Sequence, residues 1–477
     1  MIARLMKRLA LVGLLIALAL LALIGVLSVT RGTPVEYVVS RDDPTGPPSP
    51  HDSLFARTIE LYAGTTLHGG NRVQVLENGE GTYPLLWRDL RTCEHTVTVQ
   101  MYFAQPGVVA DTMSAVLREC AQKGARVLVL LDGFGAQTLA EQWVAPLRRV
   151  GIRVAWLRQL RWYTLHKAAE RSHARVVVVD GRVGYTGGFG LADYWLGNGR
   201  KPEEWRETNV RFEGPTVAQL QAAFGSTWAE ATGELLTGDA FFPRVALQSV
   251  ADRDSVSPTG VQRARRRSGP GRGASAEAPP PGDAPVDARA ATDRTVRAGL
   301  FHAVPSTGST PAERFLALTI AGARRTLYIT NAYFVPDDDF RRLLIQAAKR
   351  GVDVRIMTTG PETDVKSTLW AGRFRYEDLL RSGVRVYEYQ PANMHAKTIS
   401  VDGVWGSVGS MNFDNRSLAF NDETTLLVQD SVVVGGMDRM FLEDLRFSKE
   451  VTAAEMAGRP WWQKVRDAGA ATLQRVL

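Results

Sequence analysis

The chain carries one set of motif residues twice, and this internal repeat is the feature that most restricts its fold. The second copy reads HAKTISVDGVWGSVGSMN from His395 to Asn412, and the first reads HARVVVVDGRVGYTGGFG from His173 to Gly190. His395 follows His173 by 222 residues, close to half of the 477-residue chain. A repeat of this period predicts two similar halves.

A strand–helix–strand pattern precedes each copy of the motif, in residues 95–133 and residues 325–360. Each segment begins with a β-branched run that ends in Tyr-Phe. It continues into an apolar helix that stops at Gly124 or Gly351, and it ends in a second apolar strand. Strands that alternate with helices are typical of a parallel or mixed sheet covered by helices. We therefore expect an α/β fold with two mixed β-sheets flanked by helices.

The composition changes between the two halves. Residues 251–298 are rich in Arg, Pro, Gly and Ala and contain almost no large apolar side chain. Such a segment cannot bury enough surface to order itself. We expect a flexible insertion here, between a first half at 36–250 and a second half at 299–477.

Residues 1–35 form the predicted membrane anchor, an N-terminal transmembrane helix. Leu9–Val29 contains no charged residue, and a helix that rises about 1.5 Å per residue would span the ~30 Å hydrocarbon core of a bilayer over this length. A cleaved signal peptide is the alternative, but the run is long and lacks an Ala-x-Ala ending. The preceding basic residues favour a single pass through the cell membrane with an extracytoplasmic body: Arg4, Lys7 and Arg8.

Charge and cysteine content narrow the range of partners and sites. The net charge is +7, which fits an anionic partner such as a phospholipid or a nucleic acid, or only a mildly basic surface. Cys93 and Cys120 are the two cysteines, so the chain has at most one bridge and no cysteine-rich metal site. The histidines outside the motifs lack metal-ligand spacing. Trp461 and Trp462 lie beside basic residues, which fits an interfacial helix or ordinary terminal packing.

Each motif copy brings several functional groups to one place. His395 and Lys397 are two residues apart in a predicted strand, so their side chains share a face. A hairpin turn at Asp402-Gly403 then leads to further polar groups. The groups expected to converge on one pocket are His395, Lys397, Ser410, Asn412 and Glu423. The first copy repeats the plan with His173, Arg175, a turn at Asp180-Gly181, Gly187-Gly188 and Glu207.

The pattern H-x-K-x-x-x-x-D followed by G-[GS]-x-N, present twice, resembles the phospholipase D superfamily. The flanking segments YFVPDDDFRRLLIQAAKRGVDVRIM and GSMNFDNRSLAFNDE resemble its bacterial cardiolipin synthase branch. The likeness runs from about Asn71 to the C-terminus, without the Arg/Pro insertion. It implies a duplicated phospholipase D-like fold, whose halves are related by a pseudo-twofold axis with the site in the cleft between them.

The resemblance implies a two-step transfer that uses no metal and no organic cofactor. His173 would attack phosphorus as the nucleophile and His395 would act as general acid and base, with the reverse assignment open. Glu207 and Glu423 would accept from the far nitrogens of the rings. The groups that would hold the phosphate are Arg175, Lys397, Ser410, Asn412 and Gly188, whereas Asp180 and Asp402 are structural turn residues.

The implied reaction moves a phosphatidyl group from one phosphatidylglycerol to another and releases glycerol. The expected partners are therefore anionic phospholipid and the membrane, and no nucleic acid. A phospholipase D that hydrolyses phospholipids is the nearest alternative, and the anchor argues against a nuclease of the superfamily. Arg175 and Gly190 stand where the family has lysine and asparagine. A non-catalytic membrane protein with a decayed first half-site is therefore a third reading.

Overall fold

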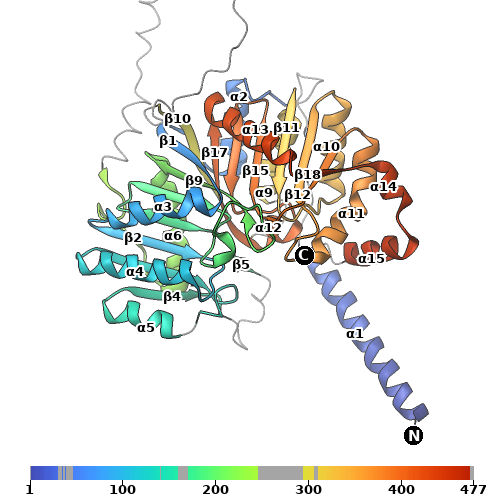
Figure 1. Cartoon of the computed structure of the whole chain (residues 1–477), viewed down its shortest axis with the longest axis horizontal. Coiled ribbons are helices and arrows are strands. Elements are labelled where there is room, and N and C mark those ends of the chain that lie inside the picture. The colour runs from blue at the N-terminus through green and yellow to red at the C-terminus, as the bar shows by residue number, and fades with distance from the viewer. Residues whose placement is uncertain are drawn as a thin grey trace, which may run out of the picture.

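The computed structural model of the chain describes residues 2–30, 35, 38, 47–139, 141–159, 170–244, 294–305 and 310–472. Residues 251–293, most of the predicted insertion, lie outside the described residues. The described part forms a body of two α/β halves side by side, and one N-terminal helix that stands apart from it (Figure 1).

The first half is built on a mixed sheet with the strand order β4-β3-β2-β6-β7-β9-β1. Strands β2, β3 and β4 run parallel, and the hairpin β6–β7 carries the first motif. Strands β9 and β1 complete the sheet in antiparallel pairs. The bounds are β1 His68–Glu77, β2 Thr96–Met101, β3 Arg126–Asp132, β4 Arg153–Leu157, β6 Val176–Val179, β7 Val183–Gly187 and β9 Thr208–Glu213.

The second half repeats this order as β13-β12-β11-β15-β16-β17-β10, with the extra strand β18 beside β13. The parallel strands β11, β12 and β13 again precede a hairpin, β15–β16, which carries the second motif. The bounds are β10 Val296–Ala303, β11 Thr326–Asn331, β12 Asp353–Thr359, β13 Arg385–Tyr389, β15 Lys397–Val401, β16 Trp405–Gly409, β17 Asn421–Gln429 and β18 Ser448–Val451.

The duplicated α/β fold that the sequence predicts is confirmed by this repeated strand order. One feature was not predicted: the two sheets join edge to edge. Strand β1 pairs antiparallel with β10, with His68 opposite Ala298 and Asn71 opposite Val296. In the described residues the result is one continuous sheet in place of two separate ones, with 16 strands when the short strand β5 (Arg171–Ser172), which pairs with β17, is counted.

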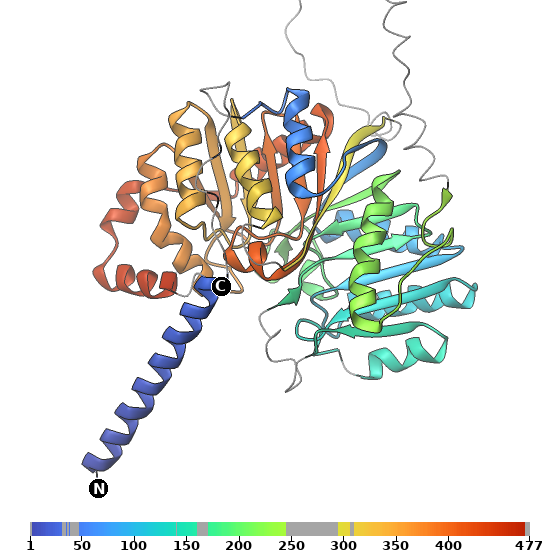
Figure 2. The ribbon, with the colours of Figure 1, turned by 180° about the vertical axis from the view of Figure 1, so that it is seen from behind.

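Helices cover both faces of this sheet (Figures 1 and 2). Local capping explains where several of them begin. Thr310 and Glu313 form a reciprocal capping box at the start of α9, with Pro311 in its first turn. The bounds are α2 Ser53–Ala63, α3 Asn78–Arg91, α4 Val108–Gln122, α5 Glu141–Arg149, α6 Thr216–Thr232, α9 Pro311–Gly322, α10 Asp338–Lys349, α11 Lys366–Arg381, α12 Asn415–Ala419, α13 Ser431–Leu445, α14 Ala453–Gly458 and α15 Trp461–Thr472.

An aspartate holds the hairpin turn of each motif against the neighbouring strand. Asp180 and Asp402 adopt left-handed backbone conformations, with φ of 51° and 52°, which aspartate tolerates better than most residues. Their carboxylates accept backbone N–H groups at the start of β2 and β11, at 2.8 Å from Thr96 and 2.9 Å from Thr326. Both side chains therefore fix the turn and the strand before it.

An apolar core spans the two halves. Phe212 and Phe224 of the first half belong to the same buried cluster as Val408 and Leu426 of the second. Helix α2 also crosses the division: it lies in the segment predicted as the first half, yet Phe55 packs at 5.2 Å on the ring of Trp405 in β16. The halves are thus fixed to each other by burial of apolar surface as well as by the joined sheet.

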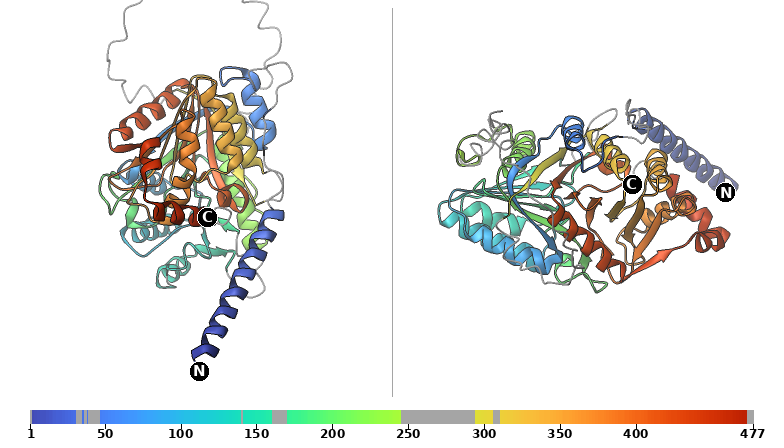
Figure 3. Two further views of the ribbon diagram at one scale, coloured as in Figure 1. Left: turned by 90° about the vertical axis from the view of Figure 1, so that its right-hand side faces the viewer. Right: turned by 90° about the horizontal axis from the view of Figure 1, so that it is seen from above.

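The N-terminal helix α1 covers Ile2–Thr30. Within it, Met6–Leu23 is long and apolar enough to cross a membrane, and none of this stretch is buried in the body. Figure 3 shows α1 apart from both halves in two further views. Its length and composition fit the predicted transmembrane anchor.

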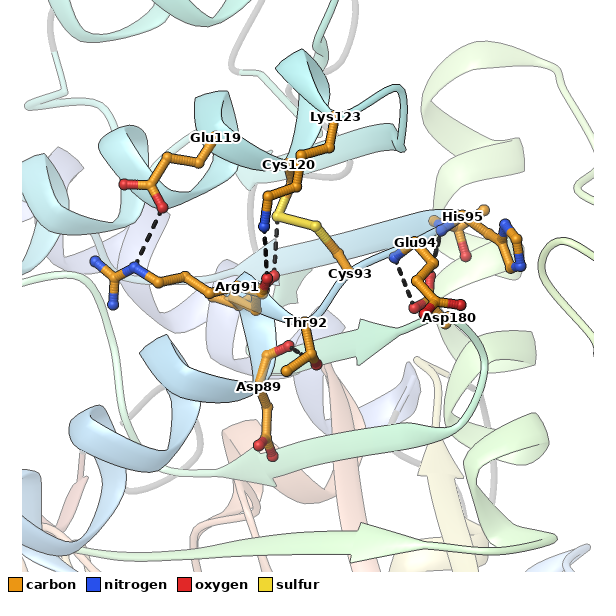
Figure 4. The surroundings of a disulfide bond; sticks show 12 residues. Asp89, Arg91, Thr92, Cys93, Glu94, His95, Glu119, Cys120, Lys123 and Asp180 are labelled. Carbon is orange, nitrogen blue, oxygen red and sulfur yellow. Dashed lines mark hydrogen bonds and ion pairs between the residues drawn. A yellow bond between two sulfur atoms is a disulfide. The ribbon is translucent and has the colours of Figure 1, made fainter.

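Cys93 and Cys120 form a disulfide bond, with their Cα atoms 6.0 Å apart (Figure 4). The bond links the segment between α3 and β2 to the last turn of α4. Both cysteines are buried. The pair therefore makes the one bridge that the cysteine content allows.

Candidate active site

A cavity of about 330 Å³ lies between the two halves. Each half contributes a histidine and a tyrosine to its wall. Those from the first half are His173 and Tyr102, and those from the second are His395 and Tyr333. The two motif histidines therefore open onto the same space, as the resemblance implies.

Short parallel strand pairs between the halves place the two histidines. Strand β5 (Arg171–Ser172) pairs with the start of β17, so that Ser172 lies opposite Asp422. Strand β14 (Asn393–Met394) pairs with β8 (Trp205–Arg206), so that Met394 lies opposite Arg206. In each pair the next residue on one side is a motif histidine and the next residue on the other side is a glutamate.

The histidine–glutamate pairs consequently run across the halves. His173 Nδ1 lies 3.0 Å from both carboxylate oxygens of Glu423. His395 Nδ1 lies 2.5 Å from Oε2 of Glu207. The sequence predicts both glutamates but pairs each with the histidine of its own half. In the structure each glutamate instead contacts the histidine of the other half. Since Nδ1 of each ring is engaged, Nε2 is the nitrogen that remains for a substrate.

The two carboxylates are themselves held by other groups. Glu423 accepts from Ser410 Oγ at 2.5 Å and from Asn421 Nδ2 at 3.2 Å. Glu207 accepts from Trp195 Nε1 at 3.1 Å and from the backbone N–H of Thr208 at 2.9 Å. Such outer contacts fix the orientation of each carboxylate and, through it, of each ring.

The motif cations lie behind the rings. Lys397 Nζ is 2.9 Å from Nδ1 of His395 and donates to the carbonyl of the same residue. Arg175 donates to the carbonyl of His173 and, through Nε, to that of Phe189 at 3.3 Å. The Arg175 guanidinium lies over the ring of Tyr102, 5.4 Å from its centre, and it lines the cavity. Arg175 therefore borders the cavity directly, whereas Lys397 contacts His395 and is not part of the cavity wall.

Burial and charge make the two rings electrostatically different. Burial lowers the pKa of His173 well below its usual value, and the charges of Arg175 and Lys397 lower it further. Burial and Lys397 also lower the pKa of His395, but the carboxylate of Glu207 opposes them. Both pKa values are thus lowered, and Glu207 is the group that counteracts this lowering at His395.

Burial and neighbouring charges also shift the pKa values of the lysine and the two glutamates of the site. Burial lowers the pKa of Lys397 to about 7. Burial raises the pKa of Glu423 to about 7 despite the hydrogen bond from Ser410. Burial also acts to raise the pKa of Glu207, but His395 and Lys397 outweigh it and leave that pKa below its usual value. Of the two carboxylates, Glu207 is the one whose ionised form the site favours.

Besides Arg175 and Lys397, three more residues are predicted to bind the phosphate, and their surroundings differ. Asn412 lines the cavity and is buried, and no described residue makes a hydrogen bond with its Oδ1. The hydroxyl of Ser410 is directed to Glu423, away from the cavity. Gly188 donates its N–H to Asn209 at 3.1 Å, and a Cβ there would lie 2.4 Å from Glu207. The glycine thus leaves room for that carboxylate.

The departure at Gly190 has a structural reason. A Cβ at this position would lie 2.7 Å from the ring of Trp195 and 2.8 Å from the carbonyl oxygen of Phe103. The indole therefore fills the space that an asparagine would need. The same indole donates to Glu207, so the first half-site has a polar group of its own in place of the family's asparagine.

Sequence reasoning missed the aromatic wall around His395. The ring centres of Trp205, Trp195 and Tyr333 lie 4.8, 5.6 and 6.3 Å from that of His395. Tyr102 lies 4.8 Å from His173 in the same way. The signal that could have identified the tyrosines is the Tyr-Phe pair that ends the first strand of both repeats.

In the described residues, no group of three or more His, Cys, Asp or Glu is arranged to hold a metal ion.

The chain is similar to known proteins over most of its length. A family model described as cardiolipin synthase, PLD-like domain, matches residues 86–228 and 316–445. The cardiolipin synthase of Geobacillus kaustophilus is 27% identical over 433 residues, covering 90% of this chain and 77% of that protein. Cardiolipin synthase A of Pseudomonas syringae pv. syringae is 29% identical, covering 85% and 76%.

A solved structure has the same fold at low sequence identity. It is the phosphatidylserine synthase of Haemophilus influenzae, which matches with a TM-score of 0.59 and 13% identity. The match covers 88% of this chain and 99% of that chain. At this identity the likeness concerns the fold, and it extends over both halves.

The cross-half pairing predicts an unequal effect of the two glutamates on His395. Glu207→Gln removes the charge that raises the pKa of His395, so this pKa should fall. Glu423→Gln, the matched control, should leave it in place, because Glu423 contacts His173. Histidine-selective NMR titration of the full chain in detergent measures both. If Glu423→Gln lowered the pKa of His395 and Glu207→Gln did not, the pairing of His395 with Glu207 would be wrong.

Proposed function

Because the chain belongs to the cardiolipin synthase family with phospholipase D-like domains, we propose that it is a phosphatidyltransferase that makes cardiolipin from two molecules of phosphatidylglycerol. The observation that carries the proposal is the pair of buried imidazoles from opposite halves, which line one cavity with a carboxylate behind each ring. Relatives named cardiolipin synthase cover most of the chain.

In the first step, Nε2 of His173 attacks the phosphorus of a phosphatidylglycerol. The bond from phosphorus to the glycerol oxygen breaks, and His395 gives that oxygen its Nε2 proton. Glycerol leaves and a phosphatidyl-histidine remains at His173. One observation favours this assignment over the reverse: Glu207 opposes the lowering of the His395 pKa by burial and Lys397, whereas Arg175 and Lys397 add to the lowering of the His173 pKa.

In the second step, the terminal hydroxyl of another phosphatidylglycerol loses its proton to Nε2 of His395. The resulting oxygen attacks the phosphorus, the phosphorus–nitrogen bond breaks, and His173 is free again. Glu423, behind His173, balances the positive charge of the ring while it carries the phosphatidyl group. Cardiolipin leaves, and His395 again holds the proton that the next cycle needs.

The cations and the amide stabilise the charge that develops on the phosphate. Arg175 and Asn412 line the cavity, and Lys397 lies behind His395. The pKa of Lys397 is about 7, and an anionic phosphodiester nearby favours its charged form. Preorganised donors of this kind act most strongly on the transition state, where the charge on the oxygens is largest.

The aromatic wall favours transfer to a lipid alcohol over hydrolysis. Trp195, Trp205 and Tyr333 surround the ring of His395, which is the base that would activate water. Apolar ring faces exclude water from this position better than small polar residues would. The hydroxyl of a bound lipid reaches Nε2 of His395 directly, and water excluded from this position does not compete with it.

The apolar helix α1 indicates that the protein is located at a membrane. We further propose that the body lies on the extracytoplasmic side. The Cys93–Cys120 disulfide supports this, because such bonds persist in oxidising compartments and are rare in the cytosol. The basic residues before the span point the same way.

The products of the reaction test the proposed function. The full chain, with phosphatidylglycerol labelled in both headgroup and acyl chains, should release one glycerol for each cardiolipin formed. His173→Ala should lower the rate by about 10³-fold or more. Phosphatidic acid as the main product would contradict transfer and identify a hydrolase. An unchanged phenotype of the His173→Ala chain in cells would instead support a non-catalytic role.

The orientation has its own test. Leu235 is 77% exposed on the body, and the two native cysteines are bonded to each other. In intact cells that express the full chain with Leu235→Cys, a membrane-impermeant maleimide should label the protein as fully as it does after lysis. Labelling only after lysis would place the body in the cytoplasm.

A further inference from the structure

Helix α15 presents an apolar and basic face that nothing in the described body covers. Trp461 is 76% exposed, Trp462 is 52% exposed and Val465 is 62% exposed. They stand on one side of the helix together with the exposed Lys464. The body thus ends on a surface where two tryptophans and an aliphatic side chain meet water.

The inner side of α15 is firmly attached. Asp467 is fully buried and pairs with Arg459 and with Arg466, the latter at 2.7 Å. Ala470, one turn further on, is also buried. The outer face is therefore exposed on a fixed helix, and the exposure does not result from a loosely held chain end.

Helix α11 extends this face with two more aromatic residues, the half-buried Trp370 and the exposed Phe374. The guanidinium of Arg466 lies 4.5 Å from the ring centre of Trp370 and 5.8 Å from that of Trp462. Phe374 follows Trp370 by one helical turn and is 44% exposed. We call the set of Trp370, Phe374, Trp461, Trp462 and Val465, with Lys464 and Arg466, the aromatic–basic face.

Helix α11 contributes to both this face and the wall of the catalytic cavity. Val365 and Thr368, at the start of α11, line that cavity. Trp370 lies two residues beyond Thr368, about 3 Å along the helix axis and about 200° around it. The aromatic–basic face and the cavity wall therefore lie on opposite sides of α11, separated by about the width of one helix.

We propose that the aromatic–basic face docks the body onto the surface of an anionic phospholipid bilayer. Tryptophan prefers the boundary between headgroups and acyl chains, and the exposed charge that accompanies it on α15 is the cation of Lys464. The anchor α1 already holds the chain at a membrane. The face would lie in the headgroup region and bring the cavity to the lipid, a mode typical of interfacial helices.

A spin label on α15 tests the proposal without relying on enzyme activity. Val465→Cys in the full chain carries a nitroxide, and the native disulfide leaves no other thiol. The protein is reconstituted in vesicles of phosphatidylglycerol and phosphatidylcholine. Electron paramagnetic resonance then compares the collisions of the label with oxygen, which concentrates in the bilayer, and with a water-soluble nickel chelate. Leu235→Cys, 77% exposed on the first half, is the matched control.

The label at position 465 should favour oxygen over the chelate several-fold more than the label at 235. Trp461→Ala with Trp462→Ala should move it toward the aqueous value while thermal unfolding stays unchanged. Equal chelate accessibility at both positions would overturn the proposal. Spin–spin broadening between labels of two copies would also overturn it, because the face would then be a contact between chains. Since these readouts do not involve catalysis, they remain informative if the enzyme proves to be a hydrolase.

Discussion

Two parallel strand pairs, each two residues long, hold the site together across the halves. In β5–β17 and β14–β8 the register sets a histidine of one half opposite a glutamate of the other. Backbone bonds extend this alignment, as in the 2.7 Å contact from His395 N–H to the carbonyl of Arg206. Neither half can complete a ring–carboxylate pair alone. The joined sheet and the shared apolar core, which fix the halves to each other, are therefore requirements of the chemistry as well as of stability.

The duplication gives the halves one fold, and small differences give their histidines separate tasks. His173 lies among positive charges that disfavour its proton, while Glu207 stabilises a proton on His395. A ring that acts as the nucleophile and a ring that acts as the acid and base need this difference in proton affinity. The exchange of asparagine for Gly190 fits the same account, because the indole of Trp195 occupies the vacated space and donates to Glu207. The first half-site therefore differs in composition at Gly190, and its space is filled by the indole that holds Glu207.

Strand periodicity and motif spacing predict the fold class and the duplication, because both are local properties of the chain. The resemblance of the motifs to the phospholipase D superfamily implies that the two histidines share one cleft. The sequence was not sufficient for contacts between the halves. The pairing of β1 with β10 and the packing of Phe55 on Trp405 depend on how the halves meet. For the same reason Glu207 reads as the partner of the histidine in its own repeat. The sequence does not predict the role of Trp195, because its contact with Glu207 depends on how the backbone turns between the two residues.

The central claim is that His173 and His395 act on one phosphorus atom in different roles, and a trapping experiment tests it most directly. A phosphatidyl ester of p-nitrophenol needs no protonation of its leaving group. With this substrate, the full chain carrying His395→Ala should release one equivalent of nitrophenolate in a burst and retain a phosphatidyl group, detected by mass spectrometry on the peptide that contains His173. The His173→Ala chain should give no burst. An adduct on His395 in the unmodified chain, or equal bursts from both variants, would contradict the account.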